Sequence, residues 1–443
     1  MNLKKNAVKY RIVLSSLFFA ATLLAFSGFA AIFCVIFKFQ AVPLLMRCGG
    51  AATAGAVLMS LLLVTVTLLF GRFYCSLLCP FGILQDIFIF ALHRKSTPQN
   101  NRFLLRYLIA GIVLGLFAGG SNAGFLLLAP YSNSGRIFAS FSLGGLIVLL
   151  LMFALTVWKK RFFCTSLCPV GTVLGAISAH SVLRLQISDE CIQCGKCAKT
   201  CPAGCIDIEQ KHIDNERCIR CMTCLKECPK ECISFKATKP EKLSVSGRRQ
   251  FLISAGAILA GTAAGLAFAK SGISLVRRKL QILPPGAGNA RKFSKKCTAC
   301  MLCVANCPED IIVPSPGGTA IIELDLSRGS CNYNCNRCGT ICPTGAISPL
   351  ALVLKRRVKI AEANFDPRNC IVFQDGKKCG KCGEACPTGA ISLRKNGTPR
   401  PIKKNLCIGC GACQKVCPAQ LKAMTVSPIE KQIILQPQGE EEK

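Results

Sequence analysis

Residues 191–202 read CIQCGKCAKTCP, and residues 218–229 repeat the pattern as CIRCMTCLKECP. Both segments follow the spacing C-x-x-C-x-x-C-x-x-x-C-P. Zinc ribbons use paired C-x-x-C units, and disulfide scaffolds are typically short secreted domains. The spacing is instead the one with which bacterial proteins bind 4Fe–4S clusters. The two segments therefore predict a two-cluster iron–sulfur block.

The ligands of this block follow from how such pairs of runs are used. Three cysteines at i, i+3 and i+6 wrap a loop around three irons, and the fourth binds the other cluster. We expect the fourth cysteine to open a helix that leads to the partner site. The expected sets are Cys191, Cys194, Cys197 and Cys228 for one cluster, and Cys218, Cys221, Cys224 and Cys201 for the other. The segment 206–217 between the runs predicts a short hairpin.

Four more runs follow in the C-terminal part of the chain. They are Cys297/Cys300/Cys303/Cys307, Cys331/Cys335/Cys338/Cys342, Cys370/Cys379/Cys382/Cys386 and Cys407/Cys410/Cys413/Cys417, each followed by Pro. The second opens with C-x-x-x-C, and in the third eight residues separate the first two cysteines, an insertion that we expect to lengthen a surface loop. Twenty-four of the 32 cysteines thus form six complete runs, predicting six 4Fe–4S clusters.

Four of the remaining cysteines lie in two short segments with the related pattern C-x-x-x-C-P, which are called the CxxxCP echoes below. Residues 73–80 read FYCSLLCP and residues 162–169 read FFCTSLCP, which places Cys75, Cys79, Cys164 and Cys168 at matched positions. Two C-x-x-x-C pairs on helical faces would supply either a four-thiolate metal site or redox-active thiols. The alternative is helical packing, since a free Cys behaves as a small hydrophobe. We interpret Cys34, Cys48, Cys205 and Cys232 as packing residues.

Apolar segments predict a helical membrane domain over residues 1–185. Residues 12–37, 48–70, 107–128 and 137–158 are uncharged or nearly so, and about 20 apolar residues suffice to cross a bilayer. The turn formers Gly119-Gly120-Ser121-Asn122 predict a break at the end of the third stretch. Twelve flanking Lys and Arg residues lie on one side and three on the other, which favours a cytoplasmic N-terminus.

The formal net charge of +33 would suit a nucleic-acid partner. That count treats cysteines as neutral, whereas four thiolates around an oxidised 4Fe–4S core leave each site at −2. Six sites lower the charge to about +21, and much of the remainder flanks apolar segments. We therefore expect no nucleic-acid partner. The other basic residues form either a docking face for an acidic redox partner or a solvated surface.

A fifth apolar run, residues 251–269, follows Ser246-Gly247-Arg248-Arg249-Gln250. This order has the form of a twin-arginine signal, which exports folded proteins and would suit a domain already loaded with clusters. The alternative is an ordinary positive flank of a fifth span. Small residues at Gly256, Ala260 and Ala264 predict a helix-packing face.

Other redox and catalytic motifs are missing from the sequence. It contains no C-x-x-C-H haem site and no Gly-rich dinucleotide fingerprint, and its three His residues exclude a multihaem protein. Gln85 and Asp86 are the one amide and acid pair near the membrane cysteines. A charge there suggests a proton-accepting quinol site, with a solvated helix face as the alternative.

Residues 1–235 resemble the NapH/MauN family, on the strength of four spans, the two CxxxCP motifs and a two-cluster block. Residues 244–430 resemble NapG-type proteins, with a twin-arginine signal and four clusters. The resemblance implies quinol oxidation and electron delivery to a periplasmic cytochrome or reductase, such as nitrate reductase. It also implies nested pairing of the four C-terminal runs, as in the four-cluster subunits of molybdoenzymes. The sets would be Cys297, Cys300, Cys303 and Cys417; Cys331, Cys335, Cys338 and Cys386; Cys370, Cys379, Cys382 and Cys342; and Cys407, Cys410, Cys413 and Cys307.

The expected fold is a helical membrane domain of about five spans joined to α+β ferredoxin-like domains. We expect a membrane domain (1–185), a cytoplasmic two-cluster domain (186–240), a signal and span (241–280) and a periplasmic four-cluster domain (281–435), in a bacterial inner membrane. Two other functions stay open: an electron donor for maturation of another redox enzyme, and a cluster-based redox sensor. Clusters in series favour conduction over sensing.

Overall fold

The computed structural model describes residues 2–26, 36–38, 40–48, 54–92, 103–139, 143–237, 245–271, 280–315 and 322–436. It divides into two compact units, Met1–Ile273 and Ser274–Lys443, and each is described by itself. Cys34, several basic residues of the charge count (Arg94, Lys95, Arg102) and the side chain of Arg248 lie outside the described parts.

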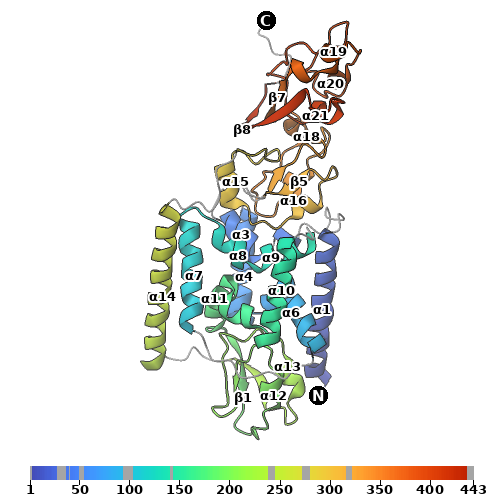
Figure 1. The fold of residues 1–443 in the computed structure, drawn as a ribbon. Helices are drawn as coiled ribbons and strands as arrows, with labels where there is room; N and C mark the ends of the chain where they lie inside the picture. Colours follow the sequence, from blue (N-terminus) through green and yellow to red (C-terminus); the bar gives the residue numbers. More distant parts are fainter. Residues whose placement is uncertain are drawn as a thin grey trace. The chain divides into compact units, whose positions relative to one another are not determined.

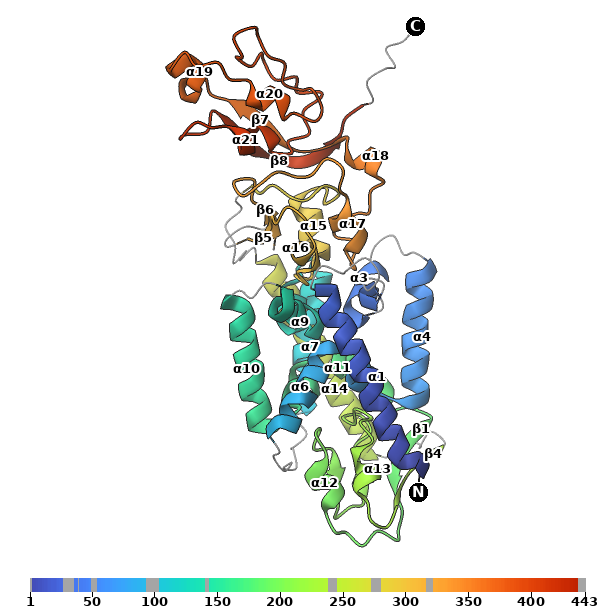
Figure 2. The same ribbon diagram turned by 90° about the vertical axis from the view of Figure 1, so that its right-hand side faces the viewer.

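The first unit is built mainly of helices (Figures 1 and 2). They are α1 (Asn2–Phe26), α3 (Ala41–Cys48), α4 (Ala54–Phe70), α5 (Tyr74–Leu77), α6 (Pro80–Leu92), α7 (Phe103–Ala118), α8 (Ala123–Leu128), α9 (Pro130–Ala139), α10 (Leu143–Lys159), the π-helical η1 (Phe163–Leu167), α11 (Pro169–Ser178) and α14 (Val245–Lys270). Short helices alternate with long ones because Pro and Gly interrupt the apolar stretches at Gly71, Pro80, Gly119, Pro130 and Pro169.

The helices differ in length from the predicted spans. Two segments, Asn6–Phe26 and Arg249–Lys270, are long and apolar enough to cross a membrane. By contrast α4, α7 and α10 have 17, 16 and 17 residues. The break predicted after the third stretch is confirmed, because α7 ends at Ala118 before Gly120 with its φ of +84°. The fourth stretch begins later than expected, since Ile137 belongs to α9. The number of spans stays a prediction.

Rows of large apolar side chains face outward from the shorter helices. Leu58 and Leu61 on α4 are 66% and 59% exposed, and Leu150 and Leu151 on α10 are 58% and 60% exposed. Soluble monomers rarely expose apolar surface in extended patches. These faces are suited to lipid, in agreement with a membrane-associated protein.

A small α+β block completes the first unit (Figure 2). Strands β1 (Leu183–Ile187) and β4 (Ile233–Ala237) pair antiparallel, as do β2 (Ile206–Asp207) and β3 (His212–Ile213). Helices α12 (Lys196–Thr200) and α13 (Thr223–Glu227) complete it. The hairpin predicted within residues 206–217 is confirmed. This block, residues 183–237, is called the dicluster block below.

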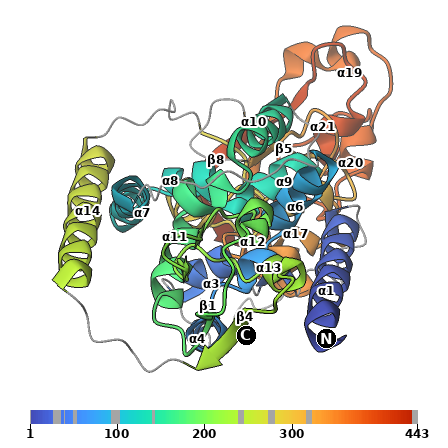
Figure 3. The ribbon, with the colours of Figure 1, turned by 90° about the horizontal axis from the view of Figure 1, so that it is seen from below.

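Helix α14 lies alongside α7, as the view from below shows (Figure 3). Glycines bring the two backbones into contact: a Cβ on Gly111 would lie 2.5 Å from the carbonyl oxygen of Ile258, and one on Gly265 would meet Ile112. The contacts advance together along both helices, so the two helices run parallel. Both therefore begin at the end of the unit that carries the dicluster block, where Tyr107 contacts Glu216.

The contact face of α14 is not the one that the sequence predicted. Gly256, Ala260 and Ala264 are exposed, whereas Gly261 and Gly265 are buried. Both sets have small residues four apart, so spacing alone could not select the face that meets the glycines of α7.

The second unit consists of short elements around cysteine-containing loops. They are α15 (Ala290–Lys296), α16 (Leu302–Ala305), β5 (Ile312–Pro314), β6 (Ile322–Leu324), α17 (Arg337–Ile341), α18 (Leu352–Lys355), β7 (Val358–Phe365), the 3₁₀ turn η2 (Pro367–Asn369), α19 (Ile371–Gln374), α20 (Lys381–Glu384), α21 (Ala412–Val416) and β8 (Met424–Ile434). Strand β5 pairs with β6 and β7 with β8, both antiparallel, with an irregularity between Lys359 and Ala361.

The contact between α7 and α14 can be tested by filling it. We expect Gly115→Leu to lower the free energy of unfolding by about 1–3 kcal/mol, the usual cost of overpacking, because a Cβ there would meet the backbone of Thr262. Thermal unfolding of the purified protein in detergent measures the change. Gly256→Leu is the matched control, since nothing lies within 4 Å of its Cβ position. Equal midpoints for the two variants would contradict the described packing.

Candidate iron–sulfur centres

Four of the six runs share one loop conformation. The residues immediately before and after the second cysteine have positive φ, at Gln193/Gly195, Arg220/Met222, Ala299/Met301 and Gly409/Gly411. For a residue other than Gly this left-handed backbone costs about 1–2 kcal/mol, and it persists only where the surroundings demand it. The shared strain therefore indicates that a common requirement shapes all four loops.

The two irregular runs lack this pair of left-handed residues. Asn336, which follows the second cysteine of the C-x-x-x-C run, has φ −131°, and Gly380, in the run with the insertion, has φ −173°. In both runs the extra residues before the second cysteine change the backbone conformation next to it. The short helix that carries the third cysteine still forms in both runs, as α17 and α20.

The fourth cysteine closes a helix rather than opening one. The expectation of a helix beginning there was wrong: α12 ends at Thr200 and α13 at Glu227, directly before Cys201 and Cys228. Both cysteines have extended backbone, with ψ 112° and 111°. The following Pro disfavours helical backbone in the residue before it. Each Cys-Pro pair therefore stops the helix and redirects the thiol toward the partner run.

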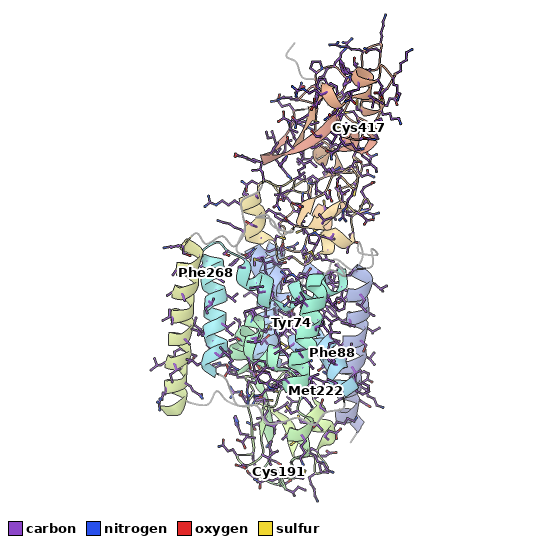
Figure 4. All side chains as sticks on the ribbon, in the orientation of Figure 1. Tyr74, Phe88, Cys191, Met222, Phe268 and Cys417 are labelled. Atoms are coloured by element: carbon purple, nitrogen blue, oxygen red, sulfur yellow. The ribbon has the colours of Figure 1, made fainter. Side chains whose placement is uncertain are left out.

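In the dicluster block the structure brings together both predicted sets. One cavity is lined by Cys191, Cys194, Cys197 and Cys228. Cys201 lies within electrostatic range of Cys218, Cys221 and Cys224. In Figure 4 the labelled Met222, from the second set's loop, lies where the block meets the helices, whereas Cys191 lies near the far end of the block. The Cys201/Cys218 set is thus the nearer of the two to the helices.

In the second unit the structure contradicts the nested pairing. One cavity is lined by Cys331, Cys335, Cys338 and Cys307, a second by Cys297, Cys300, Cys303 and Cys342, and a third by Cys407, Cys410, Cys413 and Cys386. By elimination the remaining set is Cys370, Cys379, Cys382 and Cys417, and Cys370, Cys382 and Cys417 belong to one hydrophobic cluster. Neighbouring runs therefore pair, first with second and third with fourth. Each fourth cysteine that lines a cavity meets the loop of the neighbouring run, whereas nested pairing would require the first and fourth runs, which lie far apart in the sequence, to meet.

These cavities fit the clusters that the spacing predicts. Four cavities are each lined by a complete four-cysteine set. Each takes three thiols from one run and one from its partner, the ligand arrangement of bacterial 4Fe–4S proteins. Four thiolates ligate four different irons of one cluster. The described residues accordingly contain no group of three or more His, Cys, Asp or Glu placed around a single ion.

Cys205, which the sequence suggested was a packing residue, contacts the nearer set. Its sulfur lies 3.6 Å from that of Cys201 and also bonds Cys218. Donation from Cys205 lowers the pKa of Cys218 to about 6, against the opposing effect of burial, and the Arg220 guanidinium acts in the same direction. This environment favours the thiolate, the form that binds iron.

The four cysteines of the CxxxCP echoes are buried in the same hydrophobic core as the Cys201, Cys218, Cys221 and Cys224 thiols of the dicluster block. Gln85 and Asp86, the candidate quinol residues, lie beside them. Gln85 is fully buried with its Oε1 2.9 Å from the sulfur of Cys164, and Asp86 forms an ion pair with Arg161 at 2.6 Å. Their role at a quinol site stays a prediction.

Sequence reasoning missed two residues of this region. Arg72 and Arg161 were counted as basic flanks of apolar segments, yet their side chains are 1% and 0% exposed. A signal was present: in both echoes an Arg stands three residues before the first cysteine.

Comparison with protein families agrees with this geometry. Models described as 4Fe-4S dicluster domains match residues 182–229, 214–311, 296–346 and 369–421. A model described as a 4Fe-4S binding domain matches residues 52–98, 141–187 and 338–361. No solved structure matches the chain significantly.

Relatives match different parts of the chain. The methylamine utilization ferredoxin-type protein MauN of Paracoccus denitrificans is 33% identical over 34% of this chain and 54% of its own length. The ferredoxin-type protein NapH of Haemophilus influenzae is 29% identical over 30% of this chain and 48% of its own. The ferredoxin-type protein NapG of Escherichia coli is 29% identical over 44% of this chain and 89% of its own.

The chain thus joins a NapH/MauN-like part and a NapG-like part in one polypeptide. It spans about half of the length of the NapH and MauN relatives. These likenesses and the dicluster domains establish iron–sulfur electron transfer as its class of function.

The sequential pairing can be tested by counting iron. Cys297 and Cys342 line one cavity, so the double variant Cys297→Ala/Cys342→Ala is expected to lose no more iron than either single variant, about four atoms per chain. Iron and acid-labile sulfide in protein purified without oxygen measure the loss.

The matched control is Cys297→Ala/Cys386→Ala, whose residues line two different cavities. It is expected to lose about eight irons. A loss of about eight from the Cys297/Cys342 variant as well would restore the nested arrangement.

Proposed function

We propose that this protein passes electrons from membrane quinol through a series of six 4Fe–4S clusters to a periplasmic reductase or cytochrome. The observation that carries the proposal is the set of four-cysteine cavities in both units. Each cluster would supply a one-electron carrier. Several carriers in one chain suit conduction, and a nitrate reductase is one candidate acceptor.

The described core supports a route between helices and dicluster block. One continuous hydrophobic cluster contains the CxxxCP thiols together with Cys201 and Cys218. Arg72 donates to the carbonyl oxygen of Glu216 at 3.0 Å, and the backbone N–H of Arg161 donates to that of Pro202. A path for electrons through this apolar core would connect the helical region with the nearer ligand set.

The direction of α14 supports placing the C-terminal unit on the opposite side of the membrane from the dicluster block. The helix begins at the end of the first unit that carries the block and runs parallel to α7, away from it. Phe268, near its last turn, lies at the far end of this unit in Figure 4. With the positive-inside preference, the dicluster block would be cytoplasmic and the C-terminal unit periplasmic.

Asp86 is our candidate for receiving a proton from quinol. Oxidation of a quinol releases two protons and two electrons, so a base must lie near the electron acceptor. Asp86 accepts bonds from Arg161 and Arg11 and keeps 27% of its side chain exposed. Its carboxylate is therefore both fixed in position and reachable from outside the core.

The donor can be tested with a soluble quinol. Adding a reduced quinol analogue to the oxidised protein without oxygen is expected to bleach the visible iron–sulfur absorbance. Asp86→Asn removes the base and is expected to slow this reduction about 100-fold, the lower range for general bases. Reduction by dithionite, which needs no base, should proceed at the same rate in both proteins.

Two outcomes would contradict parts of this proposal. If dithionite reduces the wild type and quinol does not, quinol is not the donor. Equal quinol rates for wild type and Asp86→Asn would assign the proton to another group. Asp189→Asn, in the dicluster block, is the matched control and should match the wild type.

Arg248 and Arg249 test the export route. If they form a twin-arginine signal, the export machinery recognises their guanidinium groups. A guanidinium makes forked hydrogen bonds that the ammonium group of Lys cannot make. Arg248→Lys/Arg249→Lys keeps the charge that sets orientation but should block export of the C-terminal unit. Protease accessibility of residues beyond 280 in spheroplasts measures it. Equal accessibility in wild type and variant would assign α14 to the ordinary insertion pathway.

A further inference from the structure

The two CxxxCP echoes are longer repeats than the cysteines alone suggest. Residues 72–82 read RFYCSLLCPFG and residues 161–171 read RFFCTSLCPVG. Each forms one helical turn, α5 or η1, and then a second helix that begins at the Pro, α6 or α11. Seven of the eleven positions are identical, including the Arg, both cysteines and the final Gly. The shared positions go well beyond what helix packing requires.

The two repeats hold each other in a reciprocal way. Arg72 donates through Nη2 to the carbonyl oxygen of Cys164, and Arg161 donates through Nη1 to that of Cys75, both at 3.1 Å. The final glycines make this crossing possible. A Cβ on Gly82 would lie 2.5 Å from the carbonyl oxygen of Cys75, and one on Gly171 would lie 2.5 Å from that of Cys164. The repeats therefore meet about an approximate two-fold axis.

All four thiols are buried where the repeats meet. Cys75, Cys79, Cys164 and Cys168 are 4–6% exposed and belong to one hydrophobic cluster. Backbone donors already point at sulfur, since the N–H of Gly171 lies 3.3 Å from the Sγ of Cys168. None of the four forms a disulfide.

The buried arginines indicate that the centre carries negative charge. Arg161 has a carboxylate partner in Asp86. Arg72 has none among the described residues: its guanidinium reaches two carbonyl oxygens and the Sγ of Cys75 at 3.8 Å, and its Nε has no partner. A buried cation without an anion is unfavourable. Neutral thiols do not balance the positive charge of the Arg72 guanidinium, whereas thiolates do.

Gln85 provides an independent sign of a ligand. Its side chain is fully buried, its Oε1 lies 2.9 Å from the sulfur of Cys164, and its Nε2 has no hydrogen-bond partner. If Cys164 is a thiolate, the amide turned over donates one Nε2–H to the sulfur, so that a donor instead of an acceptor faces the negative charge. Hydrogen bonds to ligand sulfur are a common feature of iron–sulfur sites.

We infer that Cys75, Cys79, Cys164 and Cys168 together bind a further 4Fe–4S cluster, in addition to the six in the ferredoxin-type runs. Four thiolates around the oxidised core carry −2, which Arg72 and the Arg11–Asp86–Arg161 group balance, since together they carry +2. The thiols are not grouped around a single ion, whereas a cluster takes one thiolate at each of four irons. The inference concerns a cofactor and holds whichever donor supplies the electrons.

The position of this centre gives it a place in the electron path. Arg72 contacts the carbonyl oxygen of Glu216, two residues before Cys218, and Arg161 contacts that of Pro202, next to Cys201. The same two arginines thus face the four thiols and the nearer set of the dicluster block. The further cluster would exchange single electrons with that set.

The experiment compares metal content in the full-length protein purified without oxygen. Cys79→Ala/Cys168→Ala is expected to lose about four irons and four sulfides per chain relative to wild type, with the EPR signals of the other clusters retained. Ser76→Ala, which changes a buried residue of the same repeat that is not a thiol, is the matched control and should lose none. Iron equal to the wild type in the double variant would overturn the inference.

A second measurement needs no variant. Seven clusters predict about twenty-eight irons in the wild type, and six predict about twenty-four. The alternative is that these cysteines form a redox-active disulfide. Mass spectrometry after alkylation under denaturing conditions, with and without prior reduction, tests this alternative. A disulfide between any of these four cysteines in the oxidised protein, together with about twenty-four irons, would show a redox dithiol and overturn the cluster.

Discussion

Buried arginines that converge on one short loop hold the first unit together. Glu216 accepts bonds through its carboxylate from Arg106 and Tyr107 on α7, and through its carbonyl oxygen from Arg72. Gly175 of α11 packs against the same carbonyl oxygen. Separating these groups would leave buried charges unpaired, which is strongly destabilising. Because Cys218 follows two residues later, the anchor that joins the block to the helices also positions an iron ligand.

Cysteine spacing predicted the cluster-binding loops well because the positions of the ligands are fixed by the conformation of a short chain segment. Three thiols separated by two residues can surround a cluster only in a tightly wrapped loop, and four of the six runs show its left-handed residues. The hairpin between β2 and β3 likewise followed from a short polar segment between two runs. Local rules of this kind need no knowledge of distant contacts.

The residues that sequence reasoning misjudged depend on contacts far along the chain. Cys342 pairs with the first C-terminal run, and the resemblance to other four-cluster proteins pointed to a different partner. Arg72 and Arg161 were treated as flanking charges, although each is buried against the opposite repeat. A charge count cannot separate a lysine at a lipid headgroup from an arginine inside a core. The face of α14 that meets α7 was missed for the same reason.

The parallel pairing of α7 and α14 has a consequence for a protein that resembles two separate relatives. Backbone contacts through small side chains would suffice to dock two independent subunits in a membrane. Joining them covalently converts that encounter into an intramolecular one, with an effective concentration on the order of millimolar. Every copy of the helical part then carries one copy of the C-terminal unit. Separate subunits can be made in unequal amounts, whereas one polypeptide keeps the iron–sulfur centres of both units at a fixed one-to-one ratio.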